Sequence, residues 1–175
     1  LMAHTYSHLY GIPTTGLRFF TVYGPWGRPD MALFLFCKAI LNNETIDVYN
    51  HGDMKRGFTY IDDITEGVIN IADKKPTSNP YYHHGDNNDI STSHAPYRIF
   101  NIGNPKAYNL MDYISCLENA LGIEAKKNYL EIQPGDVKST SADTSKLEEW
   151  INFKPTKELQ SGINEFVEWY RGYYK

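Results

Sequence analysis

Cysteine is scarce in this sequence, and basic blocks are absent from it. Cys37 and Cys116 fall on the apolar faces of expected helices, which indicates two reduced core thiols rather than a disulfide or a metal framework. The formal net charge is -4 and the positive charges are scattered, which argues against a surface for duplex nucleic acid. We therefore expect no nucleic-acid partner, and reduced thiols favour an intracellular, cytoplasmic location.

Long apolar runs are also missing. No stretch of about 18 apolar residues occurs and no secretory leader is recognisable, so we expect no membrane partner. The 175 residues suffice for one domain or a substantial piece of one. With 41% hydrophobic and 22% charged residues, the composition is that of a globular chain.

Two motifs of redox catalysis do not occur. Glycines at G-x-G-x-x-G spacing, which let backbone amides approach a pyrophosphate, are not found. No Tyr is followed four residues later by Lys, so the chain lacks a pair in which an ammonium lowers the pKa of a phenol. We therefore expect no catalytic residue in this chain and interpret it as a binding portion.

Apolar periodicity predicts an α/β protein with helices and small, separated strand pairs. Helical spacing is found in six segments: 1–10, 33–41, 64–72, 110–121, 145–150 and 159–170. Strand character is found in five: 14–20, 46–49, 56–61, 97–102 and 128–132. Asp30, Asn109 and Thr156 are expected to cap the helices that follow them.

Three expectations concern how these elements pair. The strand at 14–20 has the apolar end of a parallel strand but no evident partner. The strands at 46–49 and 56–61 are expected to form a hairpin-like unit. Residues 74–96, rich in Pro, Ser, Asn and Asp, are expected to form a flexible, exposed loop. The adjacent His83 and His84 lie in that loop, and we expect no metal site there because consecutive side chains point apart.

The most informative stretch, LRFFTVYGPWGRPD at 17–30, changes from an apolar run to Gly, Pro, Trp and Arg. Ligand sites in open α/β sheets lie where such strands end. The hydroxyls of Thr21 and Tyr23 and the guanidinium of Arg28 would then lie over the end of the strand. This combination suits an anionic, sugar-like ligand. The alternative is that the Trp and the Arg only cover the core.

Further candidate binding residues lie near other predicted strand ends. Arg18 and Arg56 supply cations, Asp136 can accept hydrogen bonds from two ribose hydroxyls, and Tyr49 can pack against a flat base. A charged, solvated surface is the alternative for each. Arg56 is the strongest, because the apolar residues that follow it would fix its position.

Three motifs carry a family resemblance: RFFTVYGP at 18–25, RGFTYIDDI at 56–64 and QPGDV at 133–137. With them the sequence resembles the extended short-chain dehydrogenases/reductases, a family of NAD-dependent epimerases and dehydratases. Among its members the run FFTVYGPWGRPDMA at 19–32 is most like the UDP-glucuronate 4-epimerases. The sequence departs from the family pattern at Gly57, where the family commonly has Asp.

This resemblance implies that the chain, 1–175, is the C-terminal substrate-binding domain of such an enzyme and begins inside the catalytic helix. The Rossmann half, with the NAD-binding glycines and the Tyr-x-x-x-Lys pair, would precede it. The chain alone would be inactive, and the intact enzyme a homodimer. Alternatives are another nucleotide-sugar decarboxylase, epimerase or dehydratase, or a free-standing nucleotide-sugar binding module.

The resemblance also implies residue roles. Arg56 would meet the UDP diphosphate, Asp136 the uridine ribose and Tyr49 the uracil region. Thr21 and Arg28 would hold the carboxylate of the sugar. Two further residues would line the nicotinamide side of the cleft: Phe19 and Phe20.

Overall fold

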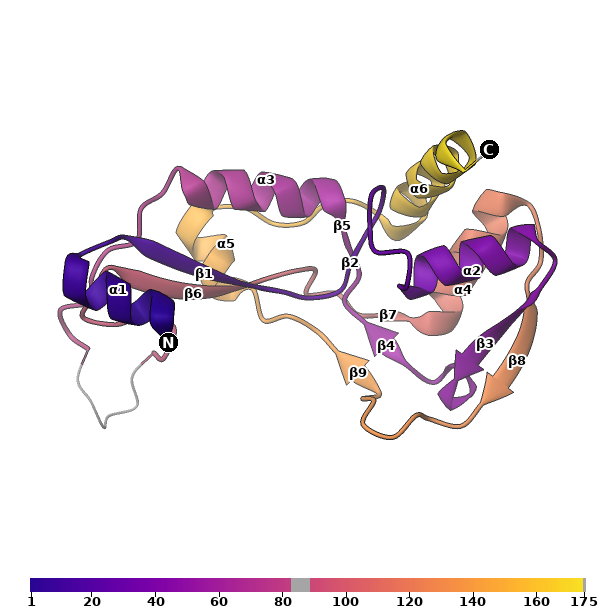
Figure 1. The fold of residues 1–175 in the computed structure, drawn as a ribbon, viewed down its shortest axis with the longest axis horizontal. Helices are drawn as coiled ribbons and strands as arrows, with labels where there is room; N and C mark the ends of the chain where they lie inside the picture. The colour runs from indigo at the N-terminus through magenta and orange to yellow at the C-terminus, as the bar shows by residue number, and fades with distance from the viewer. Residues whose placement is uncertain (83–88, 175) are drawn as a thin grey trace.

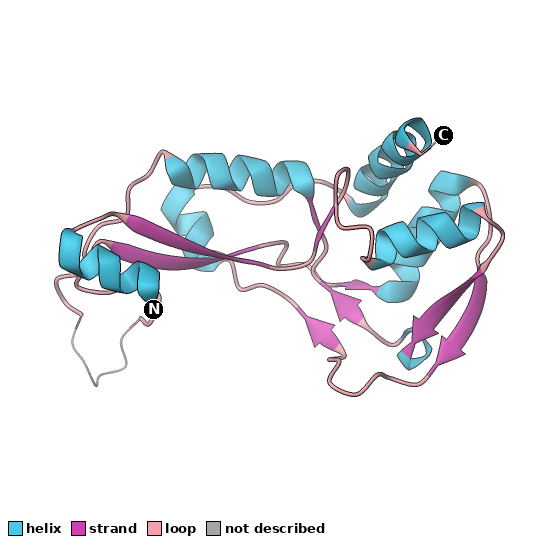
Figure 2. Ribbon diagram, in the orientation of Figure 1, coloured by secondary structure: helices cyan, strands magenta, loops and turns pink. Residues whose placement is uncertain are grey.

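Strands in this chain pair with partners that are distant in the sequence. The computed structural model describes residues 1–82 and 89–174. Two-stranded parallel sheets join three pairs: β1 (Thr14–Phe19) with β6 (Tyr97–Ile102), β2 (Val22–Tyr23) with β5 (Thr59–Tyr60), and β3 (Thr45–Tyr49) with β8 (Lys126–Leu130). A three-stranded sheet has the order β7 (Tyr108–Asn109), β4 (Lys55–Arg56), β9 (Ser139–Thr140). Figure 2 shows these short strands separated by loops and helices.

The helices flank these sheets along an elongated molecule (Figure 1). They are α1 (Met2–Tyr10), α2 (Ala32–Leu41), α3 (Ile61–Ala72), α4 (Leu110–Leu121), α5 (Ser145–Ile151) and α6 (Leu159–Tyr173), with a 3-10 turn, η1 (Asn50–Gly52). At one end α1, α3 and α5 lie around β1 and β6, and at the other α2 and α4 lie beside β3 and β8. Gly11 and Gly122 end α1 and α4 in the left-handed conformation, with φ of 63° and 69°.

Two hydrophobic clusters correspond to these two ends. The larger packs α2, α4 and α6 together, with fully buried Ile114 and Phe166 among its members. The smaller places α3 and α5 on β6, around Ile102 and Leu147. The short β2–β5 pair lies between the two ends, so the chain passes there from one cluster to the other (Figure 1).

The predicted fold class, α/β with small separated strand pairs and helices, is confirmed. Two expectations about pairing are wrong. The first strand does have a parallel partner, β6, from Thr14 opposite Tyr97 to Phe19 opposite Ile102. The expected hairpin does not form, because β3 pairs with β8 and residues 56–61 are divided among β4, β5 and the start of α3.

Two expected helix caps are also wrong. The N-cap of α2 is Met31, because Asp30 binds Arg28 instead. The N-cap of α6 is Glu158, and the backbone N–H of Thr156 donates to Asp63 Oδ1 at 3.2 Å. The Asp30 side chain thus has a different partner, and Thr156 lies two residues before the observed cap of α6. Asn109, by contrast, is the N-cap of α4.

The expected loop at 74–96 is only partly described. Thr92, Ser93 and Ala95 are buried, and the backbone N–H of Ile99 donates to Ser91 O at 2.8 Å. This end of the segment therefore packs along β6 instead of lying exposed. His83 and His84 lie outside the described residues.

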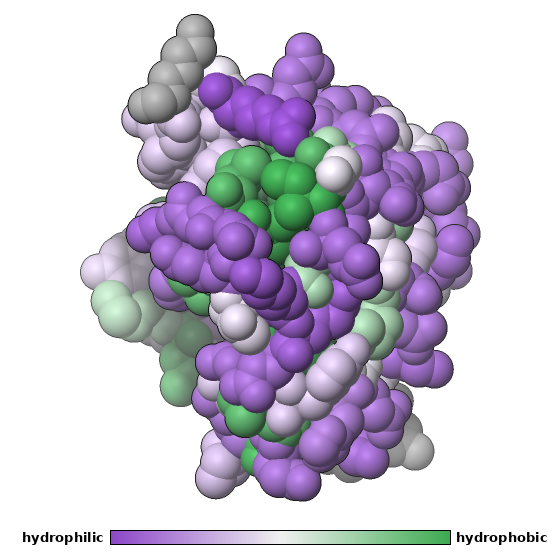
Figure 3. Space-filling model, turned by 90° about the vertical axis from the view of Figure 1, so that its right-hand side faces the viewer, coloured by the Kyte–Doolittle hydropathy of each residue, from purple (hydrophilic) through white to green (hydrophobic). Residues whose placement is uncertain are grey.

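Three surface and side-chain features complete the fold. Cys37 and Cys116 are both free thiols. Among the described residues, no helix is long and apolar enough to cross a membrane. Figure 3 looks onto the end that carries α2, α4 and β8 and shows an apolar patch that is largely surrounded by hydrophilic side chains.

Candidate functional site

A cavity of about 730 Å³ opens where β1 ends and β2 begins. The backbone N–H of Phe20 donates to Ile102 O at 3.2 Å, and Thr59 N–H donates to Thr21 O at 2.9 Å. These bonds fix the crossing from one sheet to the other. Every residue from Phe19 to Arg28 lines the cavity, together with Met31, Ile61 and Asp62.

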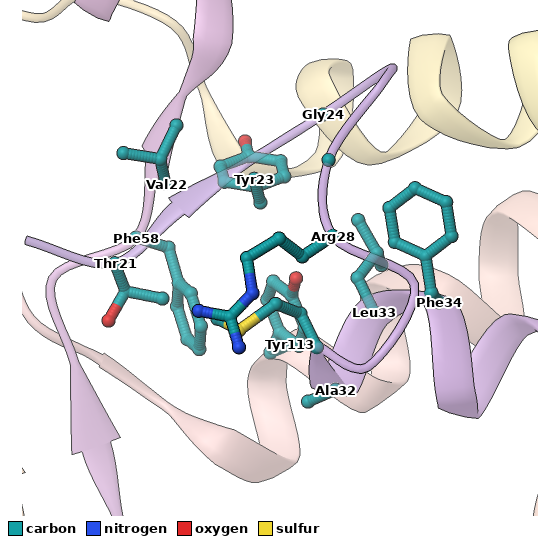
Figure 4. A pocket seen from close by; sticks show the side chains of 12 residues that line it. Thr21, Val22, Tyr23, Gly24, Arg28, Ala32, Leu33, Phe34, Phe58 and Tyr113 are labelled. Atoms are coloured by element: carbon teal, nitrogen blue, oxygen red, sulfur yellow. The ribbon is translucent and has the colours of Figure 1, made fainter.

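Thr21 and Arg28 also share a smaller adjoining recess of about 40 Å³. In Figure 4 the Arg28 guanidinium extends from its loop toward the space between Thr21 and Tyr113. The wall of the recess includes the rings of Phe58 and Tyr113, which stack with centroids 4.0 Å apart and 12° between their planes. The predicted neighbourhood of Thr21 and Arg28 is thus present in the structure.

The loop that carries Arg28 makes close contacts on two sides. Gly24 has φ of 135°, and a Cβ there would lie 2.7 Å from Cγ2 of Ile61. A Cβ on Gly27 would lie 3.0 Å from the Phe34 ring. Both glycines are therefore needed for the loop to turn tightly between α2 and α3.

The Arg28 guanidinium is held by one carboxylate. Its Nε donates to Asp30 Oδ1 at 3.0 Å and its Nη2 to Asp30 Oδ2 at 2.5 Å. This hydrogen bond raises the pKa of Arg28 above its usual range and lowers the pKa of Asp30. Asp30 occupies the Nε side of the guanidinium, and within residues 1–82 and 89–174 no hydrogen bond from Nη1 is present.

Arg56 and Asp136 form a separate ion pair. Nη2 of Arg56 donates to Asp136 Oδ1 at 2.9 Å, while its Nη1 donates to the carbonyls of Lys55 and Lys138 at 2.9 and 3.3 Å. The pair is partly buried, with 19% and 37% of the two side chains exposed. Two residues predicted to bind different parts of one ligand are therefore in direct contact.

Two other candidates lie elsewhere. Tyr49 ends β3 opposite Leu130 and does not line either cavity that Thr21 and Arg28 share. Arg18 lines a different cavity of about 180 Å³ with Asn101 and Lys146. Sequence spacing placed both near strand ends but could not tell which strand ends meet.

Sequence reasoning missed Asp30 as the partner of Arg28 and the stacked Phe58 and Tyr113. The two-residue spacing of Arg28 and Asp30 was a usable signal for the first. Tyr23, proposed as a hydroxyl for the ligand, is 6% exposed and its O–H points to Leu159 O at 3.5 Å. Burial raises the pKa of Tyr23 far above its usual value, so it acts as a core residue.

Metal-binding geometry is absent from the described part of the chain. Within residues 1–82 and 89–174, no group of three or more His, Cys, Asp or Glu side chains is arranged to hold a metal ion. His94 lies against α1, where its Nε2 is 3.2 Å from Nδ1 of His8. Burial raises the pKa of the Cys37 thiol to about 12, which makes it a poor ligand and nucleophile.

Known proteins resemble both the sequence and the fold. Residues 1–103 match the family described as "NAD dependent epimerase/dehydratase family". "Protein CapI" of Staphylococcus aureus is 57% identical over 175 residues, which are 100% of this chain and 52% of that protein. "Probable UDP-glucuronate 4-epimerase" of Rhizobium meliloti is 45% identical, again over 100% of this chain and 51% of that protein.

A solved structure is similar as well. UDP-glucuronic acid 4-epimerase from Bacillus cereus, in complex with UDP-glucuronic acid and NAD, aligns with a TM-score of 0.78 and 32% identity. The alignment covers 98% of this chain and 49% of that one. The chain therefore spans about half the length of the relatives that it matches.

Proposed function

Because the chain belongs to the NAD dependent epimerase/dehydratase family, we propose that it is the nucleotide-sugar binding portion of an NAD-dependent UDP-glucuronate 4-epimerase. In this proposal residues 1–175 are a C-terminal substrate-binding domain that begins within the catalytic helix. The relative from Rhizobium meliloti and the Bacillus cereus structure, both named as UDP-glucuronate 4-epimerases, support the choice of substrate.

The observation that carries this proposal is the shared cavity of Thr21 and Arg28. Thr21 and the guanidinium of Arg28 both line one recess beside the end of a parallel strand. A planar carboxylate accepts two hydrogen bonds from such a fork, whereas a neutral hydroxymethyl group does not. The site therefore favours a sugar with an acid group.

The fit of the cofactor to these residues is partial. Phe19 and Phe20 form an aromatic wall of the 730 Å³ cavity, and such a wall suits the face of a flat ring. NAD, when bound, supplies the oxidation of the C4 hydroxyl of the sugar to a ketone and its reduction back. The glycine-rich turn and the Tyr-x-x-x-Lys pair are not in this chain, so we propose that the chain alone is inactive.

The acid group of the sugar makes decarboxylation a competing reaction, which this chain must suppress. A ketone at C4 beside a carboxylate at C5 makes a β-keto acid, which loses carbon dioxide when the breaking bond aligns with the carbonyl π system. Thr21 and Arg28 hold the carboxylate out of that alignment while the keto sugar turns over to present its opposite face. Epimerisation then outruns decarboxylation.

The UDP part of the substrate would be held by the second group of residues. The guanidinium of Arg56 would pair with the diphosphate while it also binds Asp136 Oδ1. The second carboxylate oxygen of Asp136 can accept a hydrogen bond from a ribose hydroxyl. Tyr49 would pack against the uracil. We further propose that the intact enzyme is a homodimer. We also propose that it is cytoplasmic, in keeping with its free thiols.

Substituting Arg28 in the intact protein tests the proposed function. Loss of one charged contact worth one to two kcal/mol changes a rate ratio about five- to thirty-fold. We therefore expect Arg28→Ala to raise the share of decarboxylated product by about that factor while turnover continues. Product analysis by chromatography with UDP-glucuronate measures this share.

Arg18→Ala is the matched control, because Arg18 lines another cavity. It is expected to leave the product ratio unchanged. If Arg28→Ala leaves both the activity and the ratio of products as they are in the wild type, the proposed role of Arg28 is wrong.

A further inference from the structure

Trp26 has a backbone conformation that residues with side chains rarely adopt. Its φ is 60°, in the left-handed region, where a bulky residue is strained. Such strain persists only where surrounding contacts hold it, and it is concentrated at functional sites. Trp26 lines the 730 Å³ cavity and lies two residues before Arg28.

The contacts that hold Trp26 come from the last turns of α6. Its ring centroid lies 5.3 Å from that of Trp169 and 4.9 Å from that of Tyr173. Trp169 and Tyr173 stack on each other at 5.4 Å with 15° between their planes. We name these three rings, Trp26, Trp169 and Tyr173, the aromatic clamp.

The clamp is anchored in the core on its α6 side. Trp169 lies 5.9 Å from Phe34 and 5.9 Å from Phe166, which is fully buried. The α6 helix therefore cannot shift without disturbing the larger hydrophobic cluster. Trp26 itself is 72% exposed, so its position depends on ring contacts rather than on enclosure.

The loop has two other points of close contact, at Gly24 against Ile61 and at Gly27 against Phe34. These contacts limit how near the loop can approach its neighbours and, as contacts of small glycine residues, bury little surface. The clamp adds a specific attraction, because offset and edge-to-face aromatic pairs are favourable beyond their buried area. Together they fix the path of the backbone into Arg28.

We infer that the aromatic clamp positions Arg28 for the acid group of the nucleotide sugar, so that the far end of α6 contributes to selection of an acidic over a neutral sugar. This inference rests on the proposed function. Trp26 and Tyr173 are positioning residues, since they act through Arg28. A small displacement of a charged group can cost a large part of its effect on a bound substrate.

Tyr173 and Tyr174 offer a matched pair of variants. Both are about half exposed, at 56% and 51%. Across the described residues, the ring of Tyr174 contacts Trp169, Tyr170 and Tyr173 but not Trp26. Tyr173→Ala therefore removes a clamp ring, Tyr174→Ala removes a neighbouring ring outside the clamp, and Tyr173→Phe keeps the clamp.

The first measurement is independent of ligand. In the intact protein labelled with 5-fluorotryptophan, the fluorine resonance of Trp26 is assigned by its loss in Trp26→Phe. We expect this resonance to move toward the position of free, solvated fluorotryptophan in Tyr173→Ala, and to stay in Tyr174→Ala and Tyr173→Phe. If it does not move in Tyr173→Ala, the clamp does not hold Trp26 and the inference is overturned.

The second measurement is the ratio of the affinities for UDP-glucuronate and UDP-glucose, obtained by calorimetric titration. We expect Tyr173→Ala to lower this ratio about two- to tenfold, the range that one aromatic pair supplies. Tyr174→Ala and Tyr173→Phe should keep the wild-type ratio. If the Trp26 resonance moves in Tyr173→Ala but the affinity ratio stays at the wild-type value, the inference is overturned and the proposed function is not. Equal affinities in the wild type overturn the proposed function and, with it, the inference.

Discussion

Gly57 is packed closely against the backbone of the loop that follows β6. Its N–H donates to Thr140 O at 3.0 Å, and a Cβ there would lie 2.6 Å from the carbonyl oxygen of Asn104. The backbone of residue 104 approaches too closely for a side chain.

We therefore expect Gly57→Ala to lower the free energy of unfolding by about 1–3 kcal/mol, the usual cost of forcing extra atoms into a packed site. Thermal unfolding followed by circular dichroism measures the loss. Gly172→Ala is the control, because no atom lies within 4 Å of a Cβ there and alanine favours a helix. Equal melting temperatures for Gly57→Ala and the wild type would show that the loop at residue 104 moves aside freely.

Among single residues, those that act together over a short span were the easiest to predict. Thr21 and Arg28 lie seven positions apart on one strand and its loop, so local sequence places them in one cavity. Phe58 and Tyr113 stack although they are far apart in the sequence. Their contact depends on how α4 packs, which no local pattern encodes.

The helix α3 is joined to the segment before α6 by one carboxylate. Asp63 is 7% exposed and accepts the backbone N–H of Thr156 at 3.2 Å and that of Lys157 at 3.0 Å. Hydrogen bonds to charged groups contribute about 1.5–3 kcal/mol each. Asp63 therefore fixes the chain that leads from the smaller cluster into α6.

We expect Asp63→Ala to lower the free energy of unfolding by about 2–4 kcal/mol, since two backbone donors lose a charged acceptor. Urea unfolding at neutral pH measures this loss. Asp62→Ala changes the neighbouring residue in the same turn, which is exposed, and is expected to have an effect within about 0.5 kcal/mol. Similar losses in the two variants would mean that the acidic first turn, not the bonds of Asp63, stabilises the helix.

At the level of elements, the sequence predicts helices better than strand pairs. Apolar periodicity with Gly11 and Gly122 as stops indicated α1 and α4 with nearly their observed bounds. Strand segments were also found, but not their partners, because alternation reports which face is buried and not which strand lies alongside. The hairpin expected at 46–61 is wrong for this reason.

The molecule as a whole exposes apolar side chains along α1. Leu9 and Tyr10 are 62% and 67% exposed, and Met2 is 79% exposed. Contiguous apolar surface of this kind favours association. We therefore expect the 175-residue chain to sediment as dimers or larger species at micromolar concentration in analytical ultracentrifugation.

Substituting both Leu9 and Tyr10 with Ser should shift this distribution toward the monomer. Ile69→Ser is the control, because Ile69 is 57% exposed but lies alone on the outer face of α3. A wild-type chain that sediments only as a monomer would contradict the expectation.

The long separation between paired strands also bears on how the chain reaches its native state. Thr14 pairs with Tyr97 and Thr45 with Lys126, so neither pairing can begin until roughly eighty further residues have been synthesised. Proteins dominated by such distant contacts fold slowly, on timescales of milliseconds to seconds. On the ribosome, β1 must therefore remain unpaired with β6 until residues 97–102 have been synthesised. Wrong pairing of β1 is therefore expected mainly during translation, before any ligand can bind.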